Sequence, residues 1–446
     1  MEHFLDWSPY KDAGMGDAYA DIPKYGGDYA KAIAVCINSR QCETENKLVM
    51  CPSFKVTGNP NLSTGGRVRM LKAALSNDLT QQALNDTTLQ EAMDLCVACK
   101  GCKRECENNV DMPLIKAEYL AQKAKTQGFS FRSKLLAQTP KWLHGSKLFP
   151  VAIKLRNKND FLAKLMEKTV GISASVALPE PVNYAALETL AQEPKEDKPQ
   201  VVLFVDTFSR HFEPDVVVAA GQVLSAGGYG FEVVNAPEGE QPLCCGRTYL
   251  AQGMIDQARI EVKRLCEALS PYIKAGKTVI GFEASCVLGL RDDAKAFGLG
   301  DLVEKVAEQT FLFEEFLSRE IRAKRFDIDF ASQSGQPKTL VHGHCHQKAV
   351  GAMKAMRRVL KAIPDHDFDI IESGCCGMAG SFGIEAEHAD MASQLAEQGL
   401  MPTLRDNPDA RVVANGFSCR SQIRAKKDSR PRHLAILLRD CLKEHV

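Results

Sequence analysis

Four closely spaced cysteines in the stretch DLCVACKGCKREC, Asp94 to Cys106, follow the pattern C-x2-C-x2-C-x3-C. An iron–sulfur cluster needs four thiolates that converge on it, and short C-x2-C steps let one loop supply three of them. Where this spacing binds clusters in pairs, the last cysteine of the run is a ligand of the other cluster. The remaining ligand must then come from elsewhere, and Cys51 in MCPSF, which is followed by proline, is the natural candidate. The sequence therefore predicts a complete [4Fe-4S] site with the ligands Cys51, Cys96, Cys99 and Cys102.

A second stretch, CINSRQC, has the same outer spacing but carries Ser39 where the middle cysteine would stand. Its two cysteines and the last cysteine of the first run would form an incomplete site made of Cys36, Cys42 and Cys106. Eight residues separate Cys42 from Cys51, where the paired pattern has three. Three alternatives stay open for this site: a cluster with a non-cysteine fourth ligand, a three-iron cluster, or no iron.

The composition is that of a globular protein in a reducing compartment. The chain has 446 residues, with 45% apolar and 25% charged residues, and this length predicts about two to four domains. Lys plus Arg and Asp plus Glu each number 56, so net charge gives no argument for a nucleic-acid partner. The first residues lack the basic-then-apolar order of a signal peptide, and no apolar run approaches about 18 residues. We expect a cytoplasmic protein whose 16 cysteines serve metal or redox chemistry.

The patterns along the chain divide it into four parts. Cysteines and helical apolar spacing predict a helical, ferredoxin-like module over residues 1–130. Residues 131–198 predict a basic helical connector that ends in a charged, Pro-rich linker. Between Phe131 and Val170 the chain has nine Lys or Arg residues and two acidic residues. This connector is expected to be a solvated surface, with docking to a partner or to anionic lipid on the inner face of the membrane as the alternatives. Strand-like runs then alternate with helical ones over residues 199–332 and 333–446, as in parallel sheets.

These last two parts repeat one another. LCCGR leads to FEASC in the first unit, and GCCGMAG leads to GFSC in the second. The matching cysteines are separated by nearly equal distances, 131 positions between Cys244 and Cys375 and 133 between Cys286 and Cys419. Two similar units in tandem are therefore predicted.

The segments that carry these cysteines resemble a known family. MCPSFKVTGNPNLSTGGRVRML with CVACKGCKREC, and HCHQKA with SGCCGMAGSFG and GFSCRSQI, are similar to the iron–sulfur half of FAD-linked D-2-hydroxyacid dehydrogenases. That family includes enzymes that oxidise D-lactate, glycolate and D-2-hydroxyglutarate. The C-terminal motifs are also similar to the CCG domains of heterodisulfide reductase and of the anaerobic glycerol-3-phosphate dehydrogenase small subunit. The resemblance implies a multidomain fold of the α+β and α/β classes, with a helical dicluster ferredoxin-like domain followed by two tandem CCG domains.

The resemblance also implies ligand sets for the two CCG units. A metal-binding CCG unit uses an upstream cysteine, a Cys-Cys pair and a downstream C-x2-C step. In the second unit Gln422 replaces the last cysteine, which leaves Cys345, Cys375, Cys376 and Cys419. In the first unit Thr207 stands where the upstream cysteine would be, which leaves Cys244, Cys245 and Cys286. We expect a metal or cluster in the second unit and a depleted, structural first unit, where three thiolates could still bind zinc. The whole chain would then hold one to three clusters.

Three histidines, His342, His344 and His346, flank Cys345 just after a strand-like run. If the alternation of the strand continues, His344 and His346 lie on one side of it and Cys345 on the other. Either of these two histidines would then serve as a metal ligand or a proton carrier. His344 and His346 are therefore the candidate catalytic residues.

No segment resembles a flavin-binding domain, so the resemblance implies an electron-transfer subunit whose FAD partner is a separate chain. Electrons from a D-2-hydroxyacid would pass from that FAD through the clusters to a quinone, a cytochrome or another carrier. Two alternatives stay open. A heterodisulfide-reductase-like subunit would use the second CCG unit for thiol–disulfide chemistry, and a scaffold protein would use its iron only structurally.

Overall fold

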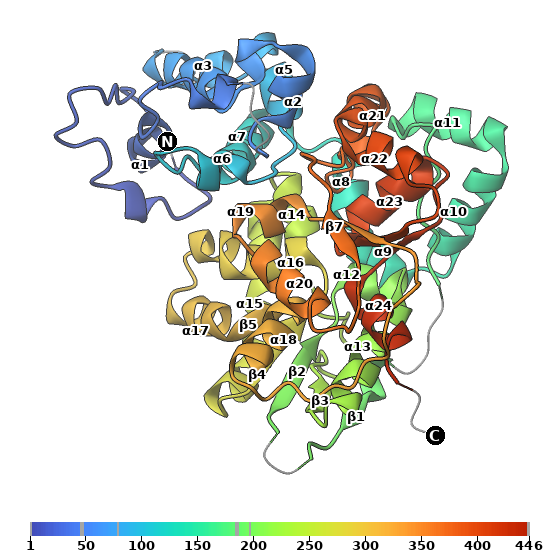
Figure 1. Ribbon diagram of the computed structural model, residues 1–446. Helices are drawn as coiled ribbons and strands as arrows, with labels where there is room; N and C mark the ends of the chain where they lie inside the picture. Colours follow the sequence, from blue (N-terminus) through green and yellow to red (C-terminus); the bar gives the residue numbers. More distant parts are fainter. Residues whose placement is uncertain (1, 45–48, 78–79, 183–186, 196–197, 444–446) are drawn as a thin grey trace.

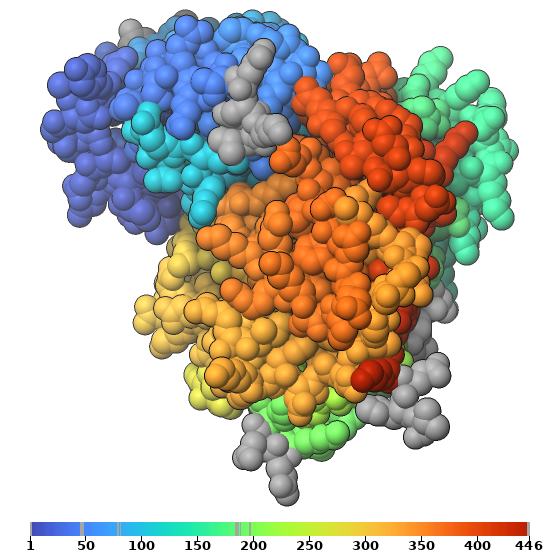
Figure 2. Space-filling model, viewed as in Figure 1, coloured from blue at the N-terminus to red at the C-terminus, as the bar shows by residue number. Residues whose placement is uncertain are grey.

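The computed structural model describes the chain except for residues 1, 45–48, 78–79, 183–186, 196–197 and 444–446. Residues 196 and 197 of the expected linker therefore lie outside the described residues. A helical N-terminal part lies at the upper left of the view, next to two α/β units (Figure 1). In the space-filling view, the N-terminal part lies directly against both α/β units (Figure 2).

The N-terminal part is helical, as predicted. Its helices are α1 (Gly27–Ala34), α2 (Pro52–Thr57), α3 (Thr64–Ser76), α4 (Thr80–Ala83), α5 (Thr87–Asp94), α6 (Gly101–Glu105) and α7 (Met112–Gln127). Three of them begin at side-chain caps, because a Ser or Asp oxygen accepts hydrogen bonds from the free backbone N–H groups of a first turn. Ser63 caps α3, and the carboxylates of Asp86 and Asp111 cap α5 and α7. The buried side chains Tyr29, Leu71 and Ile115 pack between these helices.

The basic connector is also helical and comprises α8 (Phe131–Ala137), α9 (Thr139–Gly145), α10 (Leu148–Lys158) and α11 (Asp160–Val170). Helices α10 and α11 lie at the edge of the molecule (Figure 1). Among the described residues, no helix has both the length and the apolar composition that crossing a membrane requires.

The first α/β unit contains a five-stranded sheet of order β1-β3-β2-β4-β5. Its strands are β1 (Ala191–Gln192), β2 (Gln200–Phe204), β3 (Gly230–Val233), β4 (Thr278–Gly281) and β5 (Thr310–Leu312). Only β1 is antiparallel to its neighbour. The helices are α12 (Thr207–His211), α13 (Pro214–Ala226), α14 (Arg247–Ala251), α15 (Ile255–Lys274), α16 (Ala284–Arg291), α17 (Asp301–Gln309) and α18 (Phe313–Arg322). In the central strand β2, the consecutive residues Val201, Val202 and Leu203 are all buried, as expected for a parallel sheet covered on both faces.

The second unit contains a four-stranded parallel sheet of order β7-β6-β8-β9. Its strands are β6 (Thr339–His342), β7 (Phe368–Ile370), β8 (Arg411–Ala414) and β9 (Pro431–Arg432), and its helices are α19 (Cys345–Ala349), α20 (Met353–Leu360), α21 (Ala389–Glu397), α22 (Leu400–Asp406), α23 (Phe417–Ala425) and α24 (Leu434–Asp440). The two sheets share one strand order, since β3-β2-β4-β5 corresponds to β7-β6-β8-β9. The α/β class with parallel sheets is confirmed, and the assignment of the units as tandem CCG domains stays a prediction.

Buried ion pairs join the parts of the molecule. Glu213, directly before α13 in the first unit, accepts hydrogen bonds from Arg420 and Arg424 on α23 of the second. Burial raises the pKa of Glu213, but the charges of the two arginines lower it to about 2. Lys100 of the N-terminal part, 2% exposed, pairs with Asp292 and Asp293 of the first unit. These contacts fix the relative positions of the cysteine-bearing loops.

Candidate functional site

The four predicted ligands of the complete site lie around one small cavity. Its lining includes Cys51, Cys96, Cys99 and Cys102, together with Thr64, Arg67 and Met112. The backbone N–H of Thr64, at the start of α3, donates to the Cys51 sulfur over 3.0 Å. Burial raises the pKa of the Cys99 thiol well above its ordinary value and that of Cys102 to about 12. The cavity and its donor set fit a [4Fe-4S] cluster, whose irons would bind these sulfurs as thiolates.

The loop that carries Cys99 has an unusual backbone. Ala98 (φ 47°) and Lys100 (φ 60°) both lie in the left-handed region, which costs free energy for residues other than glycine. This conformation turns the loop around the sulfur positions of the cavity. The same conformation occurs in the loop of the incomplete site, where Asn38 and Arg40 flank Ser39 and both have φ 60°. The loop that lacks the middle cysteine therefore keeps the backbone of the loop that has it.

The incomplete site adjoins the complete one. The N–H of Gly65 donates to the Cys42 sulfur over 3.2 Å, one residue after Thr64 donates to Cys51. Contact with the Cys51 thiol and this N–H lower the pKa of Cys42 to about 6. Burial raises the pKa of Cys36, and the neighbouring thiols of Cys106 and Cys42 raise it further. The start of α3 thus contributes N–H donors to cysteines of both sites.

The cysteines of the second α/β unit converge at the carboxyl end of its sheet. Cys345 is the first residue of α19 after β6, Cys375 and Cys376 follow β7, and Cys419 lies on α23 after β8. All four are buried. The thiols form a row, since Cys375 contacts Cys345 and Cys376, and Cys376 contacts Cys419. Parallel strands place their carboxyl ends at one edge, which is why residues so far apart in sequence meet here.

The first unit places its residues in corresponding positions. Thr207 is the first residue of α12 after β2, as Cys345 is the first of α19 after β6. Cys244 and Cys245 follow β3, and Cys286 lies on α16 after β4. All three cysteines are buried, and the Cys245 thiol contacts those of Cys244 and Cys286. Their proposed structural or zinc-binding role stays a prediction.

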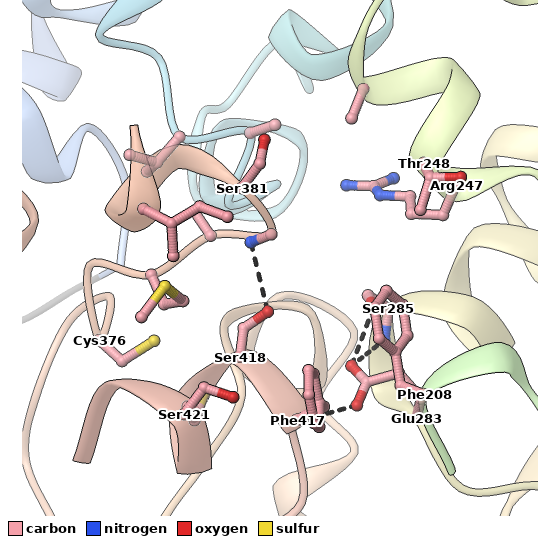
Figure 3. Close-up of a pocket in the computed structure, with 18 of the residues that line it drawn as sticks. Phe208, Arg247, Thr248, Glu283, Ser285, Cys376, Ser381, Phe417, Ser418 and Ser421 are labelled. Carbon is pink, nitrogen blue, oxygen red and sulfur yellow. Dashed lines mark hydrogen bonds between the residues drawn. The ribbon is translucent and has the colours of Figure 1, made fainter. Parts of the chain in front are cut away.

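A larger cavity lies between the two units and the N-terminal part. Its lining includes the loop Val97–Cys99, Arg247, Glu283, Phe417 and the row Cys345, Cys375, Cys376 and Cys419. Figure 3 shows Cys376 and Ser418 on one side of this cavity and Arg247 and Glu283 on the other. The rings of Phe208 and Phe417 stack beside it with centroids 5.1 Å apart. Cys99 lines this cavity and that of the complete site, so the two cavities share a wall.

The two candidate catalytic histidines lie in this region, but not as strand alternation predicted. Strand β6 ends at His342, so His344 caps α19 and Cys345 and His346 belong to the helix. The expectation of alternating sides is therefore wrong. His344 accepts the N–H of His346 over 3.2 Å, and Nε2 of His346 is 3.1 Å from the Ala98 carbonyl oxygen. Burial lowers the pKa of His344 to about 4 and that of His346 well below its ordinary value, so both rings are neutral near pH 7. Their role as ligand or proton carrier stays a prediction.

Sequence reasoning passed over two features of this region. One is the use of His342 as a possible ligand, since this residue forms a set of three donors with Cys376 and Cys419 within 4.8 Å of one another. Its position as the last residue of the strand, three before Cys345, was the available signal. The second feature is the pairing of Lys100 with Asp292, which no spacing could reveal because 192 positions separate the two.

Comparisons with known proteins bear on the same segments. Residues 32–110 match the family described as the 4Fe-4S dicluster domain. The chain is 24% identical over 440 residues to the D-2-hydroxyglutarate dehydrogenase of Escherichia coli K12, covering 88% of this chain and 42% of that protein. It is 24% identical over 416 residues to the glycolate oxidase iron-sulfur subunit of the same strain, covering 88% and 91%. It is 25% identical over 262 residues to one subunit of that strain's anaerobic glycerol-3-phosphate dehydrogenase, covering 57% and 62%.

The recognition made from the cysteine motifs is confirmed. The N-terminal part contains a 4Fe-4S dicluster domain, and the chain is homologous to oxidoreductases and oxidoreductase subunits, one of them an iron–sulfur subunit. The chain spans less than half the length of the D-2-hydroxyglutarate dehydrogenase it matches, 42%. The individual ligand sets stay predictions.

Proposed function

We propose that this chain is the iron–sulfur electron-transfer subunit of an FAD-dependent D-2-hydroxyacid dehydrogenase. A flavin-binding partner chain would oxidise D-lactate, glycolate or D-2-hydroxyglutarate. When bound here, the clusters supply one-electron carriers between that flavin and a quinone, a cytochrome or another acceptor. The names of the relatives support the class of reaction, and the 91% coverage of the glycolate oxidase iron-sulfur subunit supports the separate flavin chain.

The observation that carries this proposal is that the complete and the incomplete site adjoin. The Cys42 thiol contacts the Cys51 thiol, and the successive N–H groups of Thr64 and Gly65 donate to Cys51 and Cys42. Electron transfer slows steeply with distance, so redox centres that exchange electrons must lie close together. Buried, adjoining thiol sites provide such an arrangement and keep water away from it.

The residues that would hold the clusters fall into the two sites already described. The complete site would use Cys51, Cys96, Cys99 and Cys102. The incomplete site would use Cys36, Cys42 and Cys106, with Ser39 or a vacant position at the fourth iron. The preserved left-handed backbone at Asn38 and Arg40, and the N–H of Gly65 directed at Cys42, support a cluster at this site.

Replacement of Ser39 by cysteine should change the type of cluster rather than the number of clusters. If the native loop already binds a cluster through three cysteines, Ser39→Cys adds a fourth thiolate and at most about one iron per chain. The electron paramagnetic resonance signal and reduction potential of that cluster should change, and anaerobic iron analysis should show little gain. A gain of about four irons per chain would mean that the native loop binds none. The exposed Ser8→Cys variant controls for an added thiol elsewhere.

A tagged form purified anaerobically from its native cell, followed by mass spectrometry, tests the proposed function. We expect an FAD-binding hydroxyacid dehydrogenase to co-purify, and D-2-hydroxyacids to bleach the visible absorbance of the complex as the clusters are reduced. A partner set without a flavoprotein, or no partner, would overturn the proposal.

The basic connector supports a contact with the membrane surface where a quinone would be met. Large apolar side chains are exposed along α8, α10 and α11: Phe131 at 70%, Leu148 at 77%, Leu155 at 56%, Phe161 at 72% and Leu165 at 45%. Exposed lysines lie among them, namely Lys134, Lys147, Lys154, Lys158, Lys164 and Lys168. Exposed apolar residues beside lysines are typical of helices that bind anionic bilayers in the interface plane.

Vesicle binding should therefore depend on both charge and these apolar side chains. We expect the protein to co-sediment with vesicles that contain phosphatidylglycerol at least about tenfold more strongly than with pure phosphatidylcholine, since each lysine near an anionic surface contributes about 1 kcal/mol. The double variant Leu148→Glu/Phe161→Glu should lose this binding. Ile260→Glu, at a residue 58% exposed on α15, is the matched control and should retain it. Binding that is equal for both lipids, or unaffected by the double variant, would exclude the membrane contact.

A second candidate function is a heterodisulfide-reductase-like activity, which is favoured by the cysteine row on the wall of the larger cavity. One observation counts against this function. Gln422 stands where the last CCG cysteine would be, and its amide donates to the Ala392 carbonyl over 3.0 Å. Reduction of a low-molecular-weight disulfide by the dithionite-reduced protein alone, without a flavin partner, would support this function over the first.

A further inference from the structure

Three buried donors in the second α/β unit converge on one point. A ring nitrogen of His342 and the sulfurs of Cys376 and Cys419 all lie within 4.8 Å of one another. The exposed fractions of these residues are 1%, 2% and 1%. His342 comes from the end of β6, Cys376 from the loop after β7 and Cys419 from α23, so three segments far apart in sequence supply one donor each.

The two nitrogens of His342 have different surroundings. Nδ1 lies 3.0 Å from the Ser373 hydroxyl, while Nε2 is buried beside the Cys376 thiol and makes no hydrogen bond of ordinary geometry. A metal-ligating histidine characteristically binds through one nitrogen and holds the other by a hydrogen bond, which fixes its tautomer. His342 has this arrangement, with Nε2 left for a metal.

The spacing of the donors distinguishes a single ion from a cubane cluster. In a tetrahedral zinc site, sulfur lies about 2.3 Å and nitrogen about 2.0 Å from the metal, so neighbouring donors are about 3.5 Å apart. Cubane thiolates each bind a different iron, so their sulfurs lie farther apart. Three donors already within 4.8 Å need only a small adjustment to bind one ion. Thiolate and imidazole donors together favour Zn²⁺ over the hard cations Mg²⁺ and Ca²⁺.

This donor set also accounts for the missing cysteine of the second unit. Gln422 is 4% exposed, and its amide donates to Ala392, so its side chain fills space and does not replace a thiolate. Gly416 leaves room at the site, because a Cβ there would lie 3.1 Å from the Cys419 sulfur and 2.3 Å from the His344 ring. The rest of the row of thiols lies beside these donors, since Cys375 contacts Cys376.

We propose that His342, Cys376 and Cys419 bind one Zn²⁺ ion, with His342 supplying the ligand that the absent C-terminal cysteine would otherwise provide. Binding would release the two thiol protons to water. The ion is redox-inert, so it would organise the cavity wall beside the complete site and carry no electrons. The proposal is independent of the proposed electron-transfer function, because it concerns a different metal at a different set of residues.

Zinc K-edge X-ray absorption on the anaerobically purified full chain tests this directly, since the measurement is blind to iron. After incubation with zinc and removal of the unbound metal, we expect at least one zinc per chain, with nitrogen near 2.0 Å beside sulfur near 2.3 Å in the zinc shell. His342→Gln should remove the imidazole scattering from the absorption spectrum. It should also weaken zinc binding by more than the about 10- to 100-fold that is typical for loss of a residue that only supports a ligand. Cys419→Ser should weaken binding similarly.

His366→Gln is the matched control, because this half-buried histidine bonds Thr339 at the other end of β6 and should leave zinc unchanged. Iron content and the thermal unfolding midpoint establish that each variant is folded. The proposal is overturned if the wild-type chain retains no zinc, if His342→Gln binds zinc as tightly as the wild type, or if the absorption shows no nitrogen ligand. Iron at this site in place of zinc would overturn it equally.

Discussion

Replacement of Cys99 by serine should abolish the cluster of the complete site. The substitution removes one of the four predicted ligands. Loss of a residue that only orients a metal ligand costs about 10- to 100-fold in metal affinity or activity, so loss of a ligand itself should cost more. We therefore expect iron content to fall by about four per chain and electron transfer from the reduced flavin partner to fall more than about 100-fold. Anaerobic iron analysis and stopped-flow absorbance of the complex measure these two effects.

Cys266→Ala is the matched control for this variant. Cys266 is a fully buried cysteine in α15 and is not among the predicted ligands of either cluster site. The control should lose some stability but retain iron and electron transfer. If Cys99→Ser keeps its full iron content, Cys99 is not a ligand and the assignment of the complete site is wrong.

Replacement of Lys100 by methionine should destabilise the contact between the N-terminal part and the first α/β unit by about 3–5 kcal/mol. Lys100 pairs with Asp292 and Asp293, and Lys103 pairs with Asp292 and Asp111. Burial lowers the pKa of Lys100, but the charges of Asp293, Asp111 and Asp292 hold it above its ordinary value, so the side chain is charged. Removing this charge leaves Asp293, which is 2% exposed, without Lys100 as its partner. Urea unfolding measured by circular dichroism gives the change in free energy.

The same substitution at an exposed pair provides the comparison. Lys295 and Glu304 are paired with side chains 45% and 49% exposed, so Lys295→Met should change stability by less than about 1 kcal/mol. The double variant Lys100→Met/Asp293→Asn should recover part of the loss, because it also removes a buried negative charge. Equal effects of Lys100→Met and Lys295→Met would show that the buried network does not stabilise the interface.

Local patterns in the sequence were sufficient for much of the fold. Helical spacing predicted the N-terminal helices and the connector, because this spacing, like the capping of α5 by Asp86, depends only on residues within a turn or two. Alternating strand and helix patterns predicted parallel sheets, and the repeated cysteine motifs predicted two similar units. Strand alternation failed at His344 and His346, because the chain leaves β6 at His342 and begins a helix at Cys345.

The sequence by itself determined which residues could bind iron, because the C-x2-C step is a property of a single loop and needs no distant partner. Only the tertiary structure decided which sites adjoin. The parallel strands bring Cys345, Cys376 and Cys419 to one sheet edge, and docking of the N-terminal part brings Cys99 to the same cavity wall. Lys100 meets Asp292, and His342 meets Cys419, for the same reason: contacts between distant segments depend on how whole sheets and helices pack, and residue spacing along the chain carries no record of that packing.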